Sequence, residues 1–289
     1  MNTNTIKLSK QEAQAVKELF SSLGAEFDVV QYSEWRAKTP KIQAVYYTSG
    51  KLLLQGVNVD SITAEISKIL NKDVAEKAEI SFSEPYIGTD ESGKGDYFGP
   101  LVIAGVRVTP ETAKMFSDLG IKDSKKLNDK VIEKLAVQIK NNAPHSVIVI
   151  MPKKYNELYA SCKNLNKLLA WGHARAIENI LENSPCKFAL SDKFGDESLI
   201  KNALMKNGRE IQLEQRVRGE SDVAVAAASI IARAAFVRRM RELEETYKMT
   251  FSKGANDEVI KQAKAFCEKY SKDELKNIAK LHFKTTALV

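Results

Sequence analysis

Acidic residues stand at the ends of two apolar segments that lie far apart in the sequence. Asp90 and Glu91 follow the run 86–89, and Asp192 closes the run 187–191. If both runs are strands of one sheet, their carboxyl ends can meet at the same edge. Carboxylates packed together repel one another unless a divalent cation neutralises them, and Mg²⁺ prefers such oxygen ligands. The pattern favours phosphodiester cleavage in which two ions activate a water and stabilise the leaving oxygen.

A third acidic point comes at 218–222, before an alanine-rich segment that predicts a long helix. Glu220 and Asp222 are both candidates for a further acid at the site. Their alternative role is that of acids at a helix N-terminus, where the helix dipole favours negative charge. The residue pattern alone leaves the choice open.

A flexible basic loop, Gly93-Lys94-Gly95, follows the paired acids directly. Glycine lets a backbone approach a ligand closely, and Lys94 can add a contact to a phosphate. By itself, such a stretch is more often a solvated loop, so its meaning depends on the acids that accompany it.

Histidine and cysteine offer no comparable pattern. The histidines show neither triad nor metal spacing, and we expect His173 and His282 to be structural. The three cysteines form no CxxC pair, which fits reduced thiols better than disulfides or a zinc site.

From residue 86 onward, the sequence pattern predicts strands that alternate with long helices. These elements would position the acids. This alternation predicts a five-strand α/β domain. The expected strands are 86–90, 101–108, 146–152, 187–192 and 210–217, and the expected helices are 129–140, 164–181, 221–246 and 257–270.

The earlier part of the chain predicts a separate small domain. Residues 9–23 indicate a helix, 42–56 a hairpin and about 60–71 a second helix. The segment before Pro85 is charged and rich in small residues, as linkers are. We therefore predict a domain at 1–72, a linker at 73–84 and a larger domain at 85–289.

Composition narrows the class of protein. The chain has 289 residues, 44% of them hydrophobic, and a net charge of +7, which suggests an acidic polymer as partner. Residues 1–75 hold nine Lys or Arg and eight Asp or Glu, so the excess lies mainly in the larger part. No signal peptide is evident, and the apolar stretch 223–237 is too short for a membrane span. We expect a cytoplasmic protein, with a monomer as the default.

Five ordered motifs resemble the type 2 ribonucleases H. More narrowly, DYFGP at 96–100 and the N-terminal segment 37–56 resemble ribonuclease HIII. The similarity runs over nearly the whole chain, which makes it far more specific than a lone glycine motif. The motifs are GTDESGKGDYFGP, KDSKKLN at 122–128, LSDKF at 190–194, RGESDVAVAAASIIAR at 218–233 and KLHFKTT at 280–286.

The resemblance implies an RNase H-like fold with a five-stranded mixed sheet flanked by helices. It also implies a small N-terminal α+β domain, similar to the TATA-binding protein, that grips the substrate. The activity would be endonucleolytic cleavage of the RNA strand in RNA–DNA hybrids, with Mg²⁺ or Mn²⁺ as two ions per site and 5′-phosphate and 3′-hydroxyl products.

The family's site residues carry over onto matching positions. The resemblance implies that the catalytic, metal-holding acids are Asp90, Glu91, Asp192 and Glu220. It implies substrate contacts by Gly93, Lys94 and Gly95, which approach ribose 2′-hydroxyls, and by Lys125 and Lys126, which are candidates for phosphate contacts. We add Lys51, beside the N-terminal hairpin, as a candidate contact to nucleic acid.

Two alternatives stay open from the sequence. One is the sister activity of ribonuclease HII, incision at single ribonucleotides embedded in DNA, against which DYFGP and the N-terminal segment argue. The other is a non-catalytic protein that binds hybrids. Retention of all the acids argues against a pure binder, because unneutralised carboxylates would repel a phosphate backbone.

Overall fold

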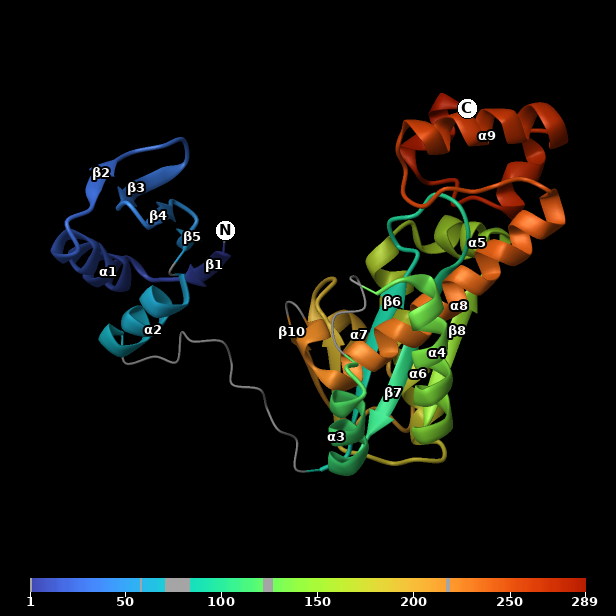
Figure 1. The fold of residues 1–289 in the computed structure, drawn as a ribbon, viewed down its shortest axis with the longest axis horizontal. Coiled ribbons are helices and arrows are strands. Elements are labelled where there is room, and N and C mark those ends of the chain that lie inside the picture. Colours follow the sequence, from blue (N-terminus) through green and yellow to red (C-terminus); the bar gives the residue numbers. More distant parts are fainter. Residues whose placement is uncertain (1, 58, 71–83, 122–126, 217–218) are drawn as a thin grey trace. The chain divides into compact units, whose positions relative to one another are not determined.

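The computed structural model describes residues 2–57, 59–70, 84–121, 127–216 and 219–289, with the backbone alone for Asn2, Asp60, Glu197 and Glu220 (Figure 1). The chain divides into two compact units, Met1–Ser81 and Phe82–Val289. Of the predicted linker 73–84, every residue but Glu84 lies outside the described residues. Within the described ranges, no helix combines the length and apolar character needed to cross a membrane.

The N-terminal unit is a five-stranded antiparallel sheet with two helices. Its strand order is β1-β5-β4-β3-β2, so the predicted hairpin β4–β5 lies inside the sheet. The elements are β1 (Asn2–Lys7), α1 (Lys10–Ser22), β2 (Glu26–Asp28), β3 (Ser33–Lys38), β4 (Ile42–Tyr47), β5 (Lys51–Gly56) and α2 (Val59–Ile69).

Local signals account for the best predicted parts of this unit. Ser9 and Glu12 form a capping box at the start of α1, which satisfies two backbone N–H groups that the helix leaves unpaired. Gly50 has φ +78°, which the turn between β4 and β5 requires and which glycine adopts without strain. Trp35 and Tyr46 are buried and lie with ring centroids 5.7 Å apart, so these aromatics serve the core.

The larger unit contains the predicted five-stranded mixed sheet, in the order β10-β9-β6-β7-β8. β6 pairs in parallel with β9 and antiparallel with β7, which makes it the central strand. The strands are β6 (Tyr86–Ser92), β7 (Leu101–Val108), β8 (His145–Ile150), β9 (Phe188–Asp192) and β10 (Gln212–Arg216).

Helices cover both faces of this sheet (Figure 1). α8 lies across β6 and β7 on one face, where α3 and α4 pack against it. α6 covers the other face together with α5 and α7. The helices of the unit are α3 (Pro110–Asp118), α4 (Asp129–Asn142), α5 (Pro152–Cys162), α6 (Leu165–Leu181), α7 (Glu197–Ala203), α8 (Val223–Tyr247) and α9 (Asp257–Tyr270), with short 3₁₀ turns η2 (Gly219–Ser221), η3 (Asp273–Asn277) and η4 (Lys284–Leu288).

The alanine-rich start of α8 lets this helix lie very close to β6. A Cβ atom at Gly88 would come within 2.2 Å of the backbone carbon of Ala224, so this position must be glycine. Buried small residues fill most of the helix surface here, which explains why no single apolar stripe is visible in the sequence. The close packing brings α8 directly onto the strand that carries Asp90.

Several predicted boundaries are shifted by one or two residues, and two of the shifts have a local cause. The strand predicted at 146–152 ends at Ile150, because Pro152 occupies the first turn of α5, a position where its missing N–H costs nothing. The helix predicted from residue 221 begins at Val223, because Asp222 is its N-cap.

Candidate active site

Asp90 and Glu91, the last acids of β6, face opposite sides of the sheet. Successive side chains of a strand alternate between its faces. Asp90 is buried beneath α8, where the Ser229 side chain hydrogen-bonds to it. Glu91 points toward α6, where it meets His173. The two neighbouring acids therefore lie in different environments.

Asp192 lies beside Asp90 on the neighbouring strand. Thr89 pairs with Ser191 in the parallel ladder, so the next residue of each strand lies at the same level. One carboxylate oxygen of Asp192 accepts a hydrogen bond from the Gly219 N–H at 2.9 Å. The convergence of these two acids, predicted from their places at strand ends, is present in the structure.

This crowding changes the protonation of Asp90. Burial, the charge of Glu91 and the charge of Asp192 raise the pKa of Asp90 to about 8, although hydrogen bonds from Ser229 and the Glu91 backbone oppose the shift. Burial and neighbouring negative charge thus disfavour the ionised form of Asp90 on the α8 face.

Glu91 has the opposite balance. His173 Nε2 lies 3.3 Å from Oε2 and Lys94 Nζ lies 3.3 Å from Oε1. Burial raises the pKa of Glu91, but the His173 hydrogen bond and the charges of His173 and Lys94 outweigh it and hold the pKa below its usual range. On the α6 face, the carboxylate is compensated.

The two glycines of the basic loop have different tasks. Gly93 has φ +86°, and a Cβ there would lie 2.2 Å from the Pro100 carbonyl oxygen, so the fold requires glycine. A Cβ at Gly95 would meet nothing within 4 Å. Gly95 thus leaves open space beside the acids, through which a ligand can reach the backbone.

The loop is held in place by a segment from much later in the chain. Lys280 is fully buried, and its Nζ donates to the carbonyl oxygens of Asp96 and Gly99, each at 2.7 Å. The Gly99 N–H donates to the Ile278 carbonyl at 2.8 Å. Burial lowers the pKa of Lys280 to about 7. The segment 278–280 therefore fixes the chain just after the glycines.

The two candidates for the fourth acid have different surroundings. Both carboxylate oxygens of Asp222 accept hydrogen bonds within the fold. Oδ1 accepts from the Ala224 and Val225 N–H groups, and Oδ2 accepts from the Tyr86 hydroxyl at 2.8 Å. Tyr86 begins β6, four residues before Asp90, which is about 13 Å along a strand. By contrast, a Cβ at Gly219 would lie 3.0 Å from the Asp192 Cα, so the backbone directly before Glu220 passes the site.

The other predicted contacts lie elsewhere. Lys125 and Lys126 fall outside the described residues. Lys51 is exposed at the start of β5 in the N-terminal unit, where it pairs with Lys7 of β1. Lys94 stands at the site, with 37% of its side chain exposed.

The donor set suits a hard cation. Among the side chains that the structure describes, no three His, Cys, Asp or Glu residues form a group able to hold a metal. Asp90 and Asp192 nevertheless share one face at one level, and the repulsion that raises the pKa of Asp90 is the kind that a divalent ion relieves. Carboxylate oxygens are the ligands that Mg²⁺ and Mn²⁺ prefer.

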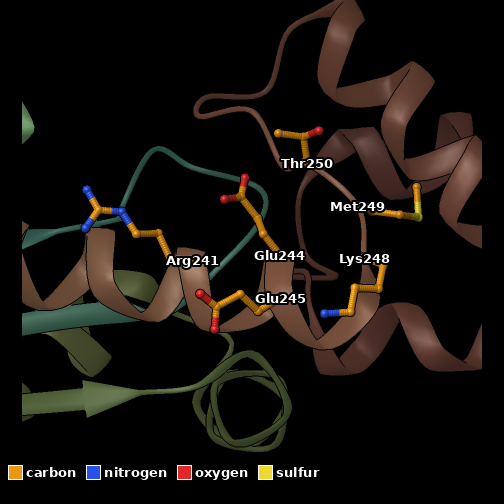
Figure 2. A pocket seen from close by; sticks show the side chains of 6 residues that line it. All are labelled: Arg241, Glu244, Glu245, Lys248, Met249 and Thr250. Atoms are coloured by element: carbon orange, nitrogen blue, oxygen red, sulfur yellow. The ribbon is translucent and has the colours of Figure 1, made fainter.

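A shallow hollow at the end of α8 lies away from these acids. Figure 2 shows its charged side chains, two of them acidic and two basic. Arg241 follows Ser229 by twelve residues, about 18 Å along the helix, so the hollow is separate from the carboxylates. Its lining is Arg241, Glu244, Glu245, Lys248, Met249 and Thr250.

Sequence reasoning missed one residue of the site. His173, expected to be structural, contacts Glu91 directly. Its place in the middle of a helix offers no spacing signal, since the contact depends on how closely α6 packs onto the sheet.

Comparisons with known proteins agree with this geometry. The family model described as Ribonuclease HII matches residues 87–286. The ribonuclease HIII of Protochlamydia amoebophila (strain UWE25) is 40% identical over 268 residues, covering 91% of this chain and 88% of its own length. The ribonuclease HIII of Chlamydia trachomatis serovar L2 (strain ATCC VR-902B / DSM 19102 / 434/Bu) is 35% identical, covering 96% and 94%.

A solved structure extends the match to three dimensions. The crystal structure of Bst-RNase HIII in complex with Mn²⁺ has a TM-score of 0.68 and 29% identity, and the match covers 99% of this chain and 97% of that one. These matches include the N-terminal unit, which does not favour the ribonuclease HII-like alternative. The chain therefore belongs to the ribonuclease HIII family of ribonuclease H enzymes.

Proposed function

We propose that the chain cleaves the RNA strand of RNA–DNA hybrids at the edge of the sheet where β6 and β9 end. The observation that carries this proposal is the placement of Asp90 and Asp192 side by side, next to the open backbone at Gly95. Two divalent ions, Mg²⁺ or Mn²⁺, would be held there by Asp90, Glu91, Asp192 and Glu220.

When bound, such ions supply an activated water and stabilise the leaving oxygen, giving 5′-phosphate and 3′-hydroxyl ends. The protein's own part is to hold the carboxylates ready. Burial beneath α8 keeps water away from Asp90, and the Gly219 N–H fixes one oxygen of Asp192. Both side chains are thus oriented before the substrate arrives, which limits reorganisation during the reaction.

Selectivity for RNA is assigned to the glycine segment. The 2′-hydroxyl is the group by which a protein distinguishes RNA from DNA, and the space at Gly95 admits it to the backbone. Lys94 would contact a neighbouring phosphate, as would Lys125 and Lys126.

The N-terminal unit is proposed to grip the hybrid. Lys7 and Lys51 are exposed on paired strands of its sheet, where they can meet a phosphate backbone. This assigns residues 1–72 to binding, 73–84 to a linker and 85–289 to catalysis. Removal of residues 1–75 should raise the KM for hybrid about tenfold and change kcat less, and an unchanged KM would refute the gripping role.

A cleavage assay on four duplexes tests the activity. The purified protein is incubated with Mg²⁺ or Mn²⁺ and labelled RNA–DNA, RNA–RNA, DNA–DNA or DNA with one embedded ribonucleotide. Cutting of the hybrid alone is expected, and efficient incision at the single ribonucleotide would instead indicate the ribonuclease HII-like activity. Retained hybrid binding without cleavage at any metal concentration would overturn the enzymatic proposal. We also propose a cytoplasmic monomer, which cell fractionation and light scattering test.

A further inference from the structure

His173 is a buried imidazole with a partner for each ring nitrogen. It is 0% exposed in α6, with Nδ1 2.9 Å from Thr89 Oγ1 and Nε2 3.3 Å from Glu91 Oε2. Thr89 and Glu91 are two residues apart on β6, so they share the face that looks toward α6. The ring therefore bridges two side chains of the strand that carries the paired acids.

Close packing of α6 puts the imidazole within reach of that strand. A Cβ at Gly172 would lie 2.6 Å from Ile103 Cδ1 of β7, so a larger residue at this point of the helix would have to displace that side chain. The ring also stacks on Phe194, with centroids 4.8 Å apart and planes at 20°. Helix, sheet and aromatic ring together leave the imidazole one orientation.

The direction of the hydrogen bonds follows from chemistry. An ionised carboxylate can only accept, so His173 Nε2 carries the proton and donates to Glu91. Nδ1 accepts from the Thr89 hydroxyl when the ring is neutral and donates to its oxygen when the ring is protonated. Such an arrangement fixes the ring plane in both states, as outer-shell partners of metal ligands do.

The two oxygens of Glu91 are treated differently. Oε2 faces the buried His173, whereas Oε1 faces Lys94, whose side chain is 37% exposed and whose Nζ also lies 5.7 Å from the Phe194 ring. An exposed lysine can move away at little cost, but a buried and stacked imidazole cannot. Oε1 is therefore the oxygen that is free to change its partner.

We propose that His173 is a positioning residue for the metal site: it holds Oε2 of Glu91 so that Oε1 faces the cation, while Lys94 occupies Oε1 until the cation arrives. The inference rests on the proposed function, since it assigns a metal to Glu91. It goes further by naming which oxygen binds, what orients it and which side chain the ion displaces.

Two substitutions distinguish positioning from simple filling of the core. The amide nitrogen of glutamine reaches the place of Nε2, so His173→Gln keeps a donor for Glu91. The shorter His173→Asn places its amide near Nδ1, where it serves Thr89 and leaves Glu91 without that donor. Both variants remove the ring that stacks on Phe194, and the melting temperature reports the additional packing that the shorter His173→Asn loses.

The test is calorimetric titration of Mn²⁺ into the full-length metal-free protein without substrate, with the melting temperature of each variant measured in parallel. We expect Mn²⁺ affinity within about threefold of wild type for His173→Gln and about tenfold or more weaker for His173→Asn. Equal affinities in both variants and wild type would overturn the proposal, as would equal losses that follow the melting temperature. If His173→Asn does not fold, Thr89→Val replaces it, because this change frees the ring; an unchanged affinity there contradicts the proposal.

A variant that should change Mn²⁺ affinity in the opposite direction completes the test. Lys94→Met removes the cation that competes for Oε1, so Mn²⁺ affinity should rise severalfold, and a fall would contradict the displacement. Failure of the proposed function gives a different result: wild-type protein would bind no Mn²⁺ at all. Wild-type binding with no effect of His173 or Lys94 variants would refute this inference alone.

Discussion

The two faces of the sheet edge treat adjacent acids in opposite ways. On the α8 face, burial and neighbouring carboxylates raise the pKa of Asp90 to about 8. On the α6 face, His173 and Lys94 hold the pKa of Glu91 below its usual range in spite of burial. The surroundings disfavour the ionised carboxylate of Asp90 on one face and favour that of Glu91 on the other.

This difference shows how the site can be stable without metal and still bind a cation favourably. If both acids were compensated by protein groups, a cation would have to displace them all. If neither were, folding would carry the full cost of two buried charges. Because the ionised form of Glu91 is favoured and that of Asp90 is disfavoured, a divalent ion gains most beside Asp90.

The largest effect on cleavage should come from replacing an acid on the α8 face. Asp192→Asn should lower single-turnover cleavage of a hybrid by about a thousandfold or more, because the ion loses a charged ligand. Hybrid affinity, measured by fluorescence anisotropy, should stay within about threefold. Activity within tenfold of wild type would show that Asp192 does not hold the ion.

A pair of variants tests which acid completes that face. Glu220→Gln should reduce cleavage about a hundredfold, whereas Asp222→Asn should leave it within about threefold. Because Asn caps a helix about as well as Asp, Asp222→Asn should cost about 1 kcal/mol through loss of the hydrogen bond from the Tyr86 hydroxyl, lowering the melting temperature by about 2–4 °C. A reversal of the two activities would move the fourth acid to Asp222.

The contrast between the faces predicts stability changes of opposite sign in metal-free protein. The folded-state pKa of Asp90 is raised from 3.8 to about 8. The amount by which Asp90 destabilises the folded state therefore grows as pH rises from about 4 to 8 and is constant above that. Asp90→Asn should therefore raise the melting temperature by several degrees at pH 9 and by less at pH 5.

Glu91→Gln should do the reverse. The lowered pKa of Glu91 gives stability that is present above its ordinary pKa of 4.5 and is lost as pH falls through the folded-state value. The variant should lower the melting temperature by a few degrees at pH 7. Scanning calorimetry in EDTA measures both changes, and equal signs for the two variants would remove the distinction between the faces.

The smallest effect should come from Lys94 as a substrate contact. Loss of one phosphate contact in Lys94→Met should reduce the dependence of log affinity for hybrid on log salt concentration by about one unit. Binding titrations at several salt concentrations, made in EDTA, separate this from the metal effect. An unchanged slope would restrict Lys94 to its role beside Glu91.

The sequence supports prediction of the parts with strong local patterns. All five strands of the mixed sheet and the helices α4, α6, α8 and α9 come from apolar runs and periodicity, and Asp90 and Asp192 converge because parallel strands end together. The sequence does not predict the N-terminal strands β1, β2 and β3, because segments such as Asn2–Lys7 are largely polar and become strands only by pairing, in this case with β5.

The parts of the site that the sequence does not predict depend on tertiary packing. His173 reaches Glu91 only because Gly172 lets α6 lie against Ile103, which no spacing along the chain reveals. The choice between Glu220 and Asp222 depends on whether an acid caps α8, and the Tyr86 contact that occupies Asp222 spans 136 residues. The sequence could name both candidates without separating them.

The anchoring of the glycine loop by Lys280 has a consequence for the order in which the site matures. The ammonium group holds the carbonyl of Asp96 across 184 residues, although the acids of β6 are made early. During synthesis, β6 leaves the ribosome long before the segment that fixes its adjoining loop. Contacts of such long sequence separation form late in folding, so substrate recognition at Gly95 should be among the last properties that the growing chain acquires.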